Sequence, residues 1–339
     1  MISELHQWLL DSDPALRWQV ERDLLGVDEH TWRNTRNQVG TEGIGAALLS
    51  YQDLDAQWDG GAYFPRNFDF STVKSQGQPW TATTWSLNSL REWGIDPHLL
   101  EGTATRLAKN SKWEYDDLPY WEGEVDCCIN GYTLANGAWL GVHVSKLANW
   151  FVEHQMHEGG WNCDWVEGST RSSFHSTLNA LKGILDYEIL ASAVPELATA
   201  RKAGEEYLLQ RNLLYRKSSG EMIAPWISDF SYPFRWKYNI LKSVDYFRSA
   251  AIHDGVKADL RLAPAIEIIR SQMQPDGIFL QGTTYPGKVW FEVDEPTGKP
   301  FSMVNFLCSQ GFELVGNSLI MCALWDSNSL LPVGSIHLA

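Results

Sequence analysis

The chain has 339 residues, 44% hydrophobic and 20% charged, which is the composition of a globular protein rather than a disordered or fibrous one. Its formal net charge of -15 leaves no basic surface for neutralising phosphates. We therefore exclude nucleic acid and anionic membrane surfaces as expected partners.

The five cysteines are too few, and odd in number, for a disulfide framework in a chain of this length, so reduced thiols are expected. The N-terminus lacks the basic and apolar pattern of a secretory signal. No run of about 18 apolar residues occurs, so no integral membrane segment is expected. These features predict a cytoplasmic protein.

The first clear element is a helix over residues 13–25, which opens with the N-cap residue Asp13 and with Pro14 and stops at Gly26. Strand-like alternation is nearly absent, so the fold is predicted to be all-α. Further helices are predicted from apolar spacing between Gly, Pro or Asp signals at 79–93, 126–141, 145–156, 172–191, 196–213, 236–251 and 258–273.

A degenerate repeat runs through these helices. Gln57-Trp-Asp-Gly-Gly and Gln155-Met-His-Glu-Gly-Gly-Trp161 each precede an aromatic loop and a helix, and Gln274-Pro-Asp-Gly-Ile-Phe279 is a third copy. Hairpins that cannot bury their apolar faces alone must stack, and stacking with steady curvature closes a ring. We therefore predict an α/α toroid as one domain over residues 1–300. Its inner helices are predicted to begin near Thr81, Asp126, Ser172 and Tyr232.

Three potential metal ligands, Asp126, Cys128 and His175, stand at the starts of consecutive inner helices. Carboxylate, thiolate and imidazole are ligand types of zinc, and three protein ligands leave the fourth tetrahedral position open for chemistry. In a ring of parallel inner helices these starts gather at one mouth of the cavity. The sequence therefore predicts a zinc site. Cys163, in the loop before His175, is a possible fourth ligand that would close the site and make it structural.

Each of these residues also has an ordinary structural interpretation. Asp126 could cap the helix that it begins, Cys128 could be core, and His175 could bond a loop carbonyl. Residues i and i+2 point about 200° apart on a regular helix, so Asp126 and Cys128 share an ion only if Asp126 lies in the non-helical cap. Because Cys127 and Cys128 are adjacent, at most one of them is expected to face a given site.

Aromatic side chains are the second informative feature, because many of the 17 Trp stand in loops and at inner-helix starts. Their rings can bind an apolar substrate, stabilise a cation or stack on sugars, or they can simply join adjacent hairpins. Arg235 and Lys237, placed on the fourth inner helix, and Arg171 are candidates for anion contact. The predicted substrate-binding rings are Trp80, Trp85, Tyr120, Trp121, Trp161, Trp165, Tyr232 and Trp236.

The repeat resembles that of the terpenoid cyclase and protein prenyltransferase superfamily of α/α toroids, over roughly residues 15–300. Val125-Asp-Cys-Cys128 and Phe174-His-Ser-Thr-Leu-Asn-Ala-Leu-Lys-Gly183 are similar to the two prenyltransferase segments that supply zinc ligands. The resemblance implies a zinc enzyme that acts on a small, apolar, isoprenoid-like substrate by thiolate alkylation or cation chemistry. By this motif the ligand roles fall on Asp126, Cys128 and His175.

The chain departs from both branches of that superfamily. Glu122 and Glu124 stand where prenyltransferases carry the Arg and Lys that hold a diphosphate, and two carboxylates would repel that group. The Asp-x-Asp-Asp acid motif of the cyclases is absent, and Asp116-Asp117 is only a pair. Two other function classes therefore stay open: a carbohydrate-active α/α toroid that uses paired carboxylates, and a non-catalytic toroid that binds a ligand in its cavity.

Residues 301–339 do not follow the repeat. After Lys299 the chain has no Lys or Arg, and only Glu313 and Asp326 carry charge. Such an apolar tail is interpreted as a divergent closing segment, an altered reading frame or a surface for self-association.

Overall fold

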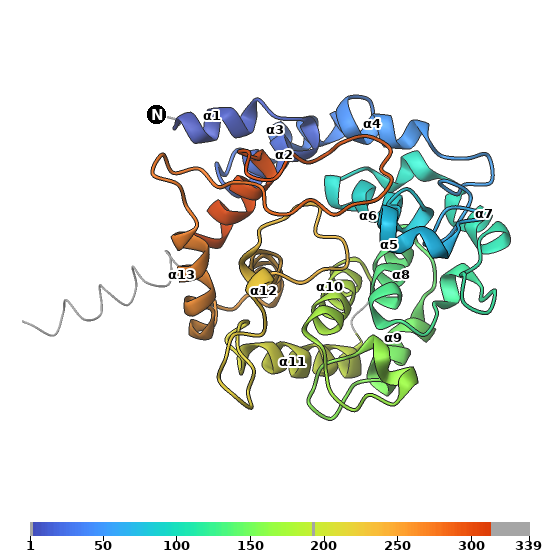
Figure 1. Ribbon diagram of the computed structural model, residues 1–339. Coiled ribbons are helices and arrows are strands. Elements are labelled where there is room, and N and C mark those ends of the chain that lie inside the picture. The colour runs from blue at the N-terminus through green and yellow to red at the C-terminus, as the bar shows by residue number, and fades with distance from the viewer. Residues whose placement is uncertain (1–2, 192–193, 313–339) are drawn as a thin grey trace, which may run out of the picture.

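A computed structural model describes residues 3–191 and 194–312 (Figure 1). Within these residues no β-strand occurs, which confirms the all-α class. No helix in the described part of the chain is both long and apolar enough to cross a membrane. The α-helices are α1 (Glu4–Leu10), α2 (Pro14–Asp23), α3 (Glu29–Gln38), α4 (Gly43–Ser50), α5 (Val73–Gln76), α6 (Thr83–Trp93), α7 (Thr103–Asn110), α8 (Cys127–Trp139), α9 (Ser145–Glu153), α10 (Phe174–Leu190), α11 (Pro195–Leu209), α12 (Ile240–Asp254) and α13 (Ala263–Ser271).

Short 3-10 helices stand in the loops between the α-helices. Residues 302–312 are also helical and follow the last loop. The 3-10 helices are η1 (Phe70–Thr72), η2 (Pro97–Leu100), η3 (Tyr120–Glu122), η4 (Cys163–Glu167), η5 (Pro225–Ser228) and η6 (Leu260–Leu262).

The eight helices predicted from spacing are all present, but the start predicted for the fourth inner helix is wrong. α12 begins at Ile240, because Asn239 caps it by accepting a hydrogen bond from the backbone N–H of Lys242 at 2.8 Å. Residues 231–239 form a loop before this cap. Arg235 and Lys237 therefore lie in a loop and not on a helix.

Helices α6, α8, α10 and α12 pack side by side in sequence order, and α9 and α11 lie outside α8 and α10 (Figure 1). The approach of α8 to α10 depends on small residues. A Cβ added at Gly131 of α8 would lie 2.6 Å from the carbonyl oxygen of Asn179 on α10, and Gly183 of α10 faces Gly131 in the same way. The two backbones are thus fixed against each other close to the first turn of α8.

The predicted repeat is visible in the hydrogen bonds of two buried tryptophans. Each indole N–H donates to a carbonyl of the preceding outer helix, and each backbone N–H donates to a threonine hydroxyl of the following inner helix. Six residues before each tryptophan stands a glutamine, Gln52 or Gln155. Its side-chain amide donates to the backbone carbonyl oxygen four residues after the glutamine. The first copy therefore begins at Gln52, and not at Gln57 as the sequence motif indicates. The tryptophan bonds join Trp58 to Leu48 (2.9 Å) and Thr83 (3.1 Å), and Trp161 to Phe151 (2.9 Å) and Thr177 (3.0 Å).

The third copy is completed by the helix at residues 302–312. Asn305 accepts a hydrogen bond from the backbone N–H of Phe279 at 2.8 Å and donates one to its carbonyl oxygen at 2.7 Å. Val304, Phe306 and Cys308 of this helix are buried in the main core. The domain boundary at residue 300 and self-association through the tail stay predictions, because residues 313–339 lie outside the described part of the chain.

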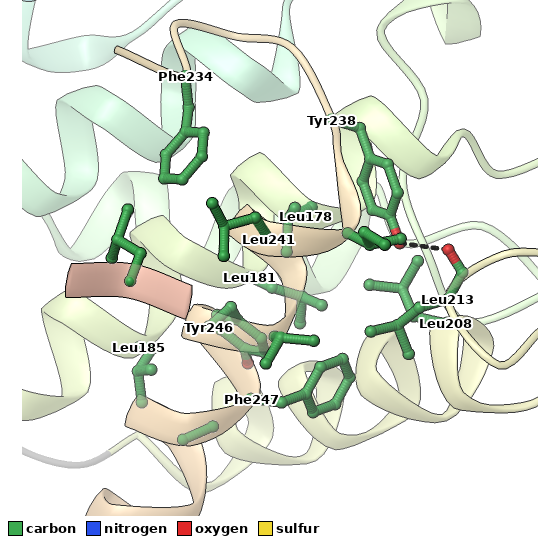
Figure 2. Close-up of a cluster of buried hydrophobic side chains, with 14 of the residues drawn as sticks. Leu178, Leu181, Leu185, Leu208, Leu213, Phe234, Tyr238, Leu241, Tyr246 and Phe247 are labelled. Carbon is green, nitrogen blue, oxygen red and sulfur yellow. Dashed lines mark hydrogen bonds between the residues drawn. The ribbon is translucent and has the colours of Figure 1, made fainter. Parts of the chain in front are cut away.

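The main hydrophobic core lies between α10, α11 and α12 (Figure 2). Leucines of α10 face Leu241 and Phe247 of α12, and Tyr238, from the loop before α12, fills the gap beside them. The Tyr238 hydroxyl donates to the Leu213 carbonyl oxygen at 2.8 Å, so the polar group of this buried ring has a hydrogen-bond partner. The core thus holds the loop 231–239 against the start of α10.

Candidate metal centre

Three cysteine thiols meet at the first turn of α8. The Cys163 sulfur, from η4, lies 3.4 Å from the Cys127 sulfur and 3.4 Å from the Cys128 sulfur, and all three sulfurs lie within 4.8 Å of one another. The expectation that only one of the adjacent cysteines faces the site is wrong. Successive helical side chains diverge by about 100°, and Cys163 lies between the two directions and reaches both.

Two contacts hold Cys163 over the N-terminal end of α8. Its backbone N–H donates to the Ser176 hydroxyl at 3.2 Å, and this hydroxyl lies 3.4 Å from the Cys163 sulfur. Two residues on, the Trp165 indole donates to the Val125 carbonyl oxygen at 2.8 Å. η4 is therefore anchored both to α10 and to the segment that leads into α8.

The Cys128 sulfur has a polar partner whose orientation is fixed. Asn179 on α10 donates from Nδ2 to this sulfur at 3.4 Å, while its Oδ1 accepts from the Lys242 ammonium at 2.6 Å. Nδ2 also lies 2.8 Å from the Trp236 carbonyl oxygen, which can only accept, so the NH2 group must be on the side of the sulfur and Oδ1 on the side of Lys242. Hydrogen bonds from Cys127, Cys163 and Asn179 hold the pKa of the Cys128 thiol well below its usual range. These donors favour the thiolate form of Cys128.

Asp126 occupies the N-cap position of α8, as the shared-ion geometry requires, but its side chain makes no capping hydrogen bond. The Glu124 carboxylate instead accepts hydrogen bonds from the backbone N–H groups of Val125 and Asp126, at 2.7 and 3.2 Å. Burial, together with the charge of Cys163, raises the pKa of Asp126 to about 7. The carboxyl group of Asp126 is therefore not used for capping, and it lies outside the group of three thiols.

His175, the second residue of α10, lies outside the group of three thiols. Its Nδ1 accepts a hydrogen bond from the backbone N–H of Tyr238 at 2.8 Å, so its loop partner is an N–H group and not a carbonyl. A neutral imidazole that accepts at Nδ1 carries its proton on Nε2, so Nε2 is a donor in this arrangement. Burial, with the charges of Lys242 and Lys237, lowers the pKa of His175 to about 4. Metal ligation by Asp126 and His175 stays a prediction.

Two of the predicted substrate-binding rings form a wall beside the thiols. Trp80 and Trp85 lie edge to face with ring centroids 4.8 Å apart, and Trp85 continues to Tyr63 at 4.7 Å and to Tyr132 at 5.6 Å. Burial and the nearby charge of Cys128 raise the pKa of Tyr63 well above its usual range. The wall therefore extends from the thiols to Trp80.

The other predicted rings make hydrogen bonds that join neighbouring hairpins. Substrate binding by them stays a prediction, since these contacts account for their burial without a ligand. Apart from Trp161, described above, the bonds link Tyr120 to Thr84 (2.9 Å), Trp121 to Ala104 (3.0 Å), Trp165 to Val125 (2.8 Å), Tyr232 to Trp93 (3.3 Å) and Trp236 to Gln78 (3.2 Å).

No protein-family model matches the chain, and a search of curated proteins finds no match. Two residues of the site escaped sequence reasoning, Cys127 and Asn179. The signal for Asn179 was its spacing, because it stands four residues after His175 on the same helix face. Cys127 had no separate signal, since the direction of its side chain depends on where η4 lies.

Proposed function

We propose that the chain is a zinc protein in which Cys127, Cys128 and Cys163 hold the metal. The observation that carries this proposal is the position of three reduced sulfurs from two segments within 4.8 Å of one another. Thiolate sulfur is a soft ligand that suits zinc, and three protein ligands leave one tetrahedral position for a further group. The hydrogen bond from Asn179 to Cys128 is also compatible with a bound metal, because an amide can donate to a metal-bound thiolate.

Two residues compete for the fourth position. Asp126 is the better placed of them, because it directly precedes Cys127 and its carboxyl group makes no capping bond. His175 would have to give up the Tyr238 N–H and exchange its ring proton before it could bind a metal. We therefore assign the fourth position to Asp126 in the resting protein.

We further propose an enzyme of the prenyltransferase and terpenoid cyclase type, with an apolar isoprenoid-like substrate and an α/α toroid fold. The ring is supported by the repeated tryptophan contacts and by Gln310, which donates to Asp23 of α2 at 2.9 Å and so joins the two ends of the helix series. The substrate class is supported by the wall from Trp80 to Tyr63. When bound, zinc would lower the pKa of a coordinated thiol or act as a Lewis acid.

Metal analysis of the purified protein tests the zinc site. We expect one zinc per chain in the wild type, and loss of most of it in Cys128→Ala and Cys163→Ala. Cys308→Ala is the matched control, since Cys308 is also a buried free thiol but lies in the helix 302–312, outside the trio. Zinc-edge absorption should show three sulfurs at about 2.3 Å. A metal-free wild type, or equal zinc loss in Cys308→Ala, would refute the site.

The activity is tested by incubating the zinc-loaded protein with isoprenoid diphosphates and the corresponding alcohols and analysing products by mass spectrometry. A product that requires zinc, and that is absent with Trp85→Ala, supports the proposal. A zinc-loaded protein that converts none of these substrates would restrict the metal to a structural role.

A further inference from the structure

Arg235 carries a cation without a direct partner. Within residues 3–191 and 194–312 its guanidinium makes no hydrogen bond and no ion pair, and Asp294 is the carboxylate that acts most strongly on it from a distance. Burial lowers the pKa of Arg235 to about 10, so the side chain is still charged at neutral pH. Arg235 is half-buried, whereas the fully buried Arg201 is paired with Glu188 and Glu205, as buried charges normally are.

The backbone fixes where this cation lies. Arg235 has φ 51°, a left-handed conformation that costs energy for any residue other than glycine. Its carbonyl oxygen accepts two hydrogen bonds, from the Tyr132 hydroxyl at 3.1 Å and from the Lys242 ammonium at 3.1 Å. The position is therefore maintained by the surrounding structure at a cost in stability.

Two hollows meet at this guanidinium. A cavity of about 450 Å³ is lined by Arg235 with Tyr232, Thr283, Tyr285 and Asp294. A much smaller apolar pocket, of about 30 Å³, lies between Arg235 and side chains that include Trp80, Trp85 and Val289. The guanidinium carbon stands 4.9 Å over the Trp80 ring. Arg235 thus lies between the 450 Å³ cavity and the aromatic wall.

We propose that Arg235 binds the carboxylate head group of an amphipathic molecule that enters the 450 Å³ cavity. The planar guanidinium matches a carboxylate with two parallel hydrogen bonds. Glu292, Asp294 and Glu295 also line the cavity, so a multiply charged phosphate is repelled more strongly than a carboxylate with its single charge. The view that this molecule is the substrate rests on the proposed function, but the binding itself does not require the metal.

The experiment is calorimetric titration of the protein with octanoate, octanol and octyl phosphate, as purified and after removal of metal with a chelator. We expect octanoate to bind best in both preparations. Arg235→Gln should weaken octanoate binding at least about tenfold, the loss expected for a charge-assisted hydrogen-bond pair, while octanol binding stays unchanged. Lys237→Gln is the matched control. It removes the same charge from a side chain that is two residues from Arg235 and does not line the cavity.

A second variant keeps the test decisive if Arg235→Gln does not fold. Arg235→Lys retains the charge but lacks the planar fork, and it should bind octanoate several-fold more weakly than the wild type. Equal affinity of the wild type for octanoate and octanol, or an equal effect of Lys237→Gln, would overturn the head-group site. Tighter binding of octyl phosphate would overturn the carboxylate assignment. Absence of zinc with normal octanoate binding would count against the proposed metal centre alone.

Discussion

The amide of Asn179 shows how one buried side chain can lower the pKa of another. Lys242 has three oxygen acceptors, namely Asn179 Oδ1 and the carbonyl oxygens of Arg235 and Lys237. The amide NH2 faces the Cys128 sulfur and the Trp236 carbonyl oxygen, both of which accept. This donor favours the thiolate form of Cys128 and so helps to lower its pKa, independently of any bound ion.

We predict that Asn179→Leu weakens metal binding by about 10–100-fold, the usual effect of removing a hydrogen bond to a ligand. The leucine has a similar volume but no donor for the sulfur. The measurement is competition with a chelator, and in the cobalt-substituted protein the sulfur-to-metal absorption band should shift.

The control for this variant is Asn88→Leu. Asn88 is also buried on an inner helix, where it accepts from Asn136 at 2.8 Å, but it does not contact the thiols. If both variants bound the metal as the wild type does, Asn179 would have no influence on the site.

At the scale of elements, the contact between α8 and α10 determines whether the thiols meet. Cys128 lies one turn before Gly131, and Asn179 lies one turn before Gly183. The absence of side chains at both glycines lets the two backbones touch. A small separation of these helices would move the sulfur away from its amide donor.

We therefore predict that Gly131→Ala destabilises the protein by about 1–3 kcal/mol, the range for overpacking, and also weakens metal binding. The added Cβ would lie 2.6 Å from the Asn179 carbonyl oxygen, so α10 has to move. Urea unfolding followed by tryptophan fluorescence measures the first effect, and metal titration measures the second.

Gly141→Ala separates the two effects. Gly141 has φ 72° and open space around it, so alanine there causes backbone strain without displacing α10. It should lower stability and leave the metal affinity unchanged. Equal metal affinity in Gly131→Ala would contradict the role assigned to the α8–α10 contact.

At the scale of the whole molecule, an ion-pair cluster holds the outer helix α11 to α10 and α12. Arg201 of α11 pairs with Glu188 at 2.7 Å and with Asp254 at 2.6 Å. Burial opposes ionisation of Asp254, but hydrogen bonds from Arg201 and Lys202 outweigh it and lower the pKa of Asp254 to about 2. Arg201 thus joins three helices, and the link to α12 depends on one partly exposed carboxylate.

The stability that comes from Asp254 should depend on pH. Because its pKa is lower in the folded than in the unfolded protein, its contribution is fully present above about pH 4 and is lost as the pH falls towards 2. We predict that Asp254→Asn costs about 1–3 kcal/mol at pH 6 and that the difference from the wild type shrinks below pH 4. Urea unfolding at several pH values measures this, and a difference independent of pH would contradict it.

The helices, the repeat and the two segments that carry the thiols could be predicted from the sequence, because apolar spacing and glycine turns are local signals. The prediction missed the start of α12, which is decided by the cap at Asn239, and it misplaced the first repeat by five residues. It named Cys163 only as a fourth ligand, whereas Cys163 is the residue that joins the two thiols of α8, and His175 lies outside this group. Which side chains converge depends on how η4 packs over α8, and no local pattern encodes that contact.

The bond between Gln310 and Asp23 joins segments that are 287 residues apart in the chain. During translation, α2 leaves the ribosome long before the helix at 302–312 that completes its surroundings. Leu16 and Val20 of α2, which belong to the main core, must therefore wait while most of the polypeptide that forms this core is synthesised. Nascent chains of this protein should depend on chaperones until the helix at 302–312 emerges.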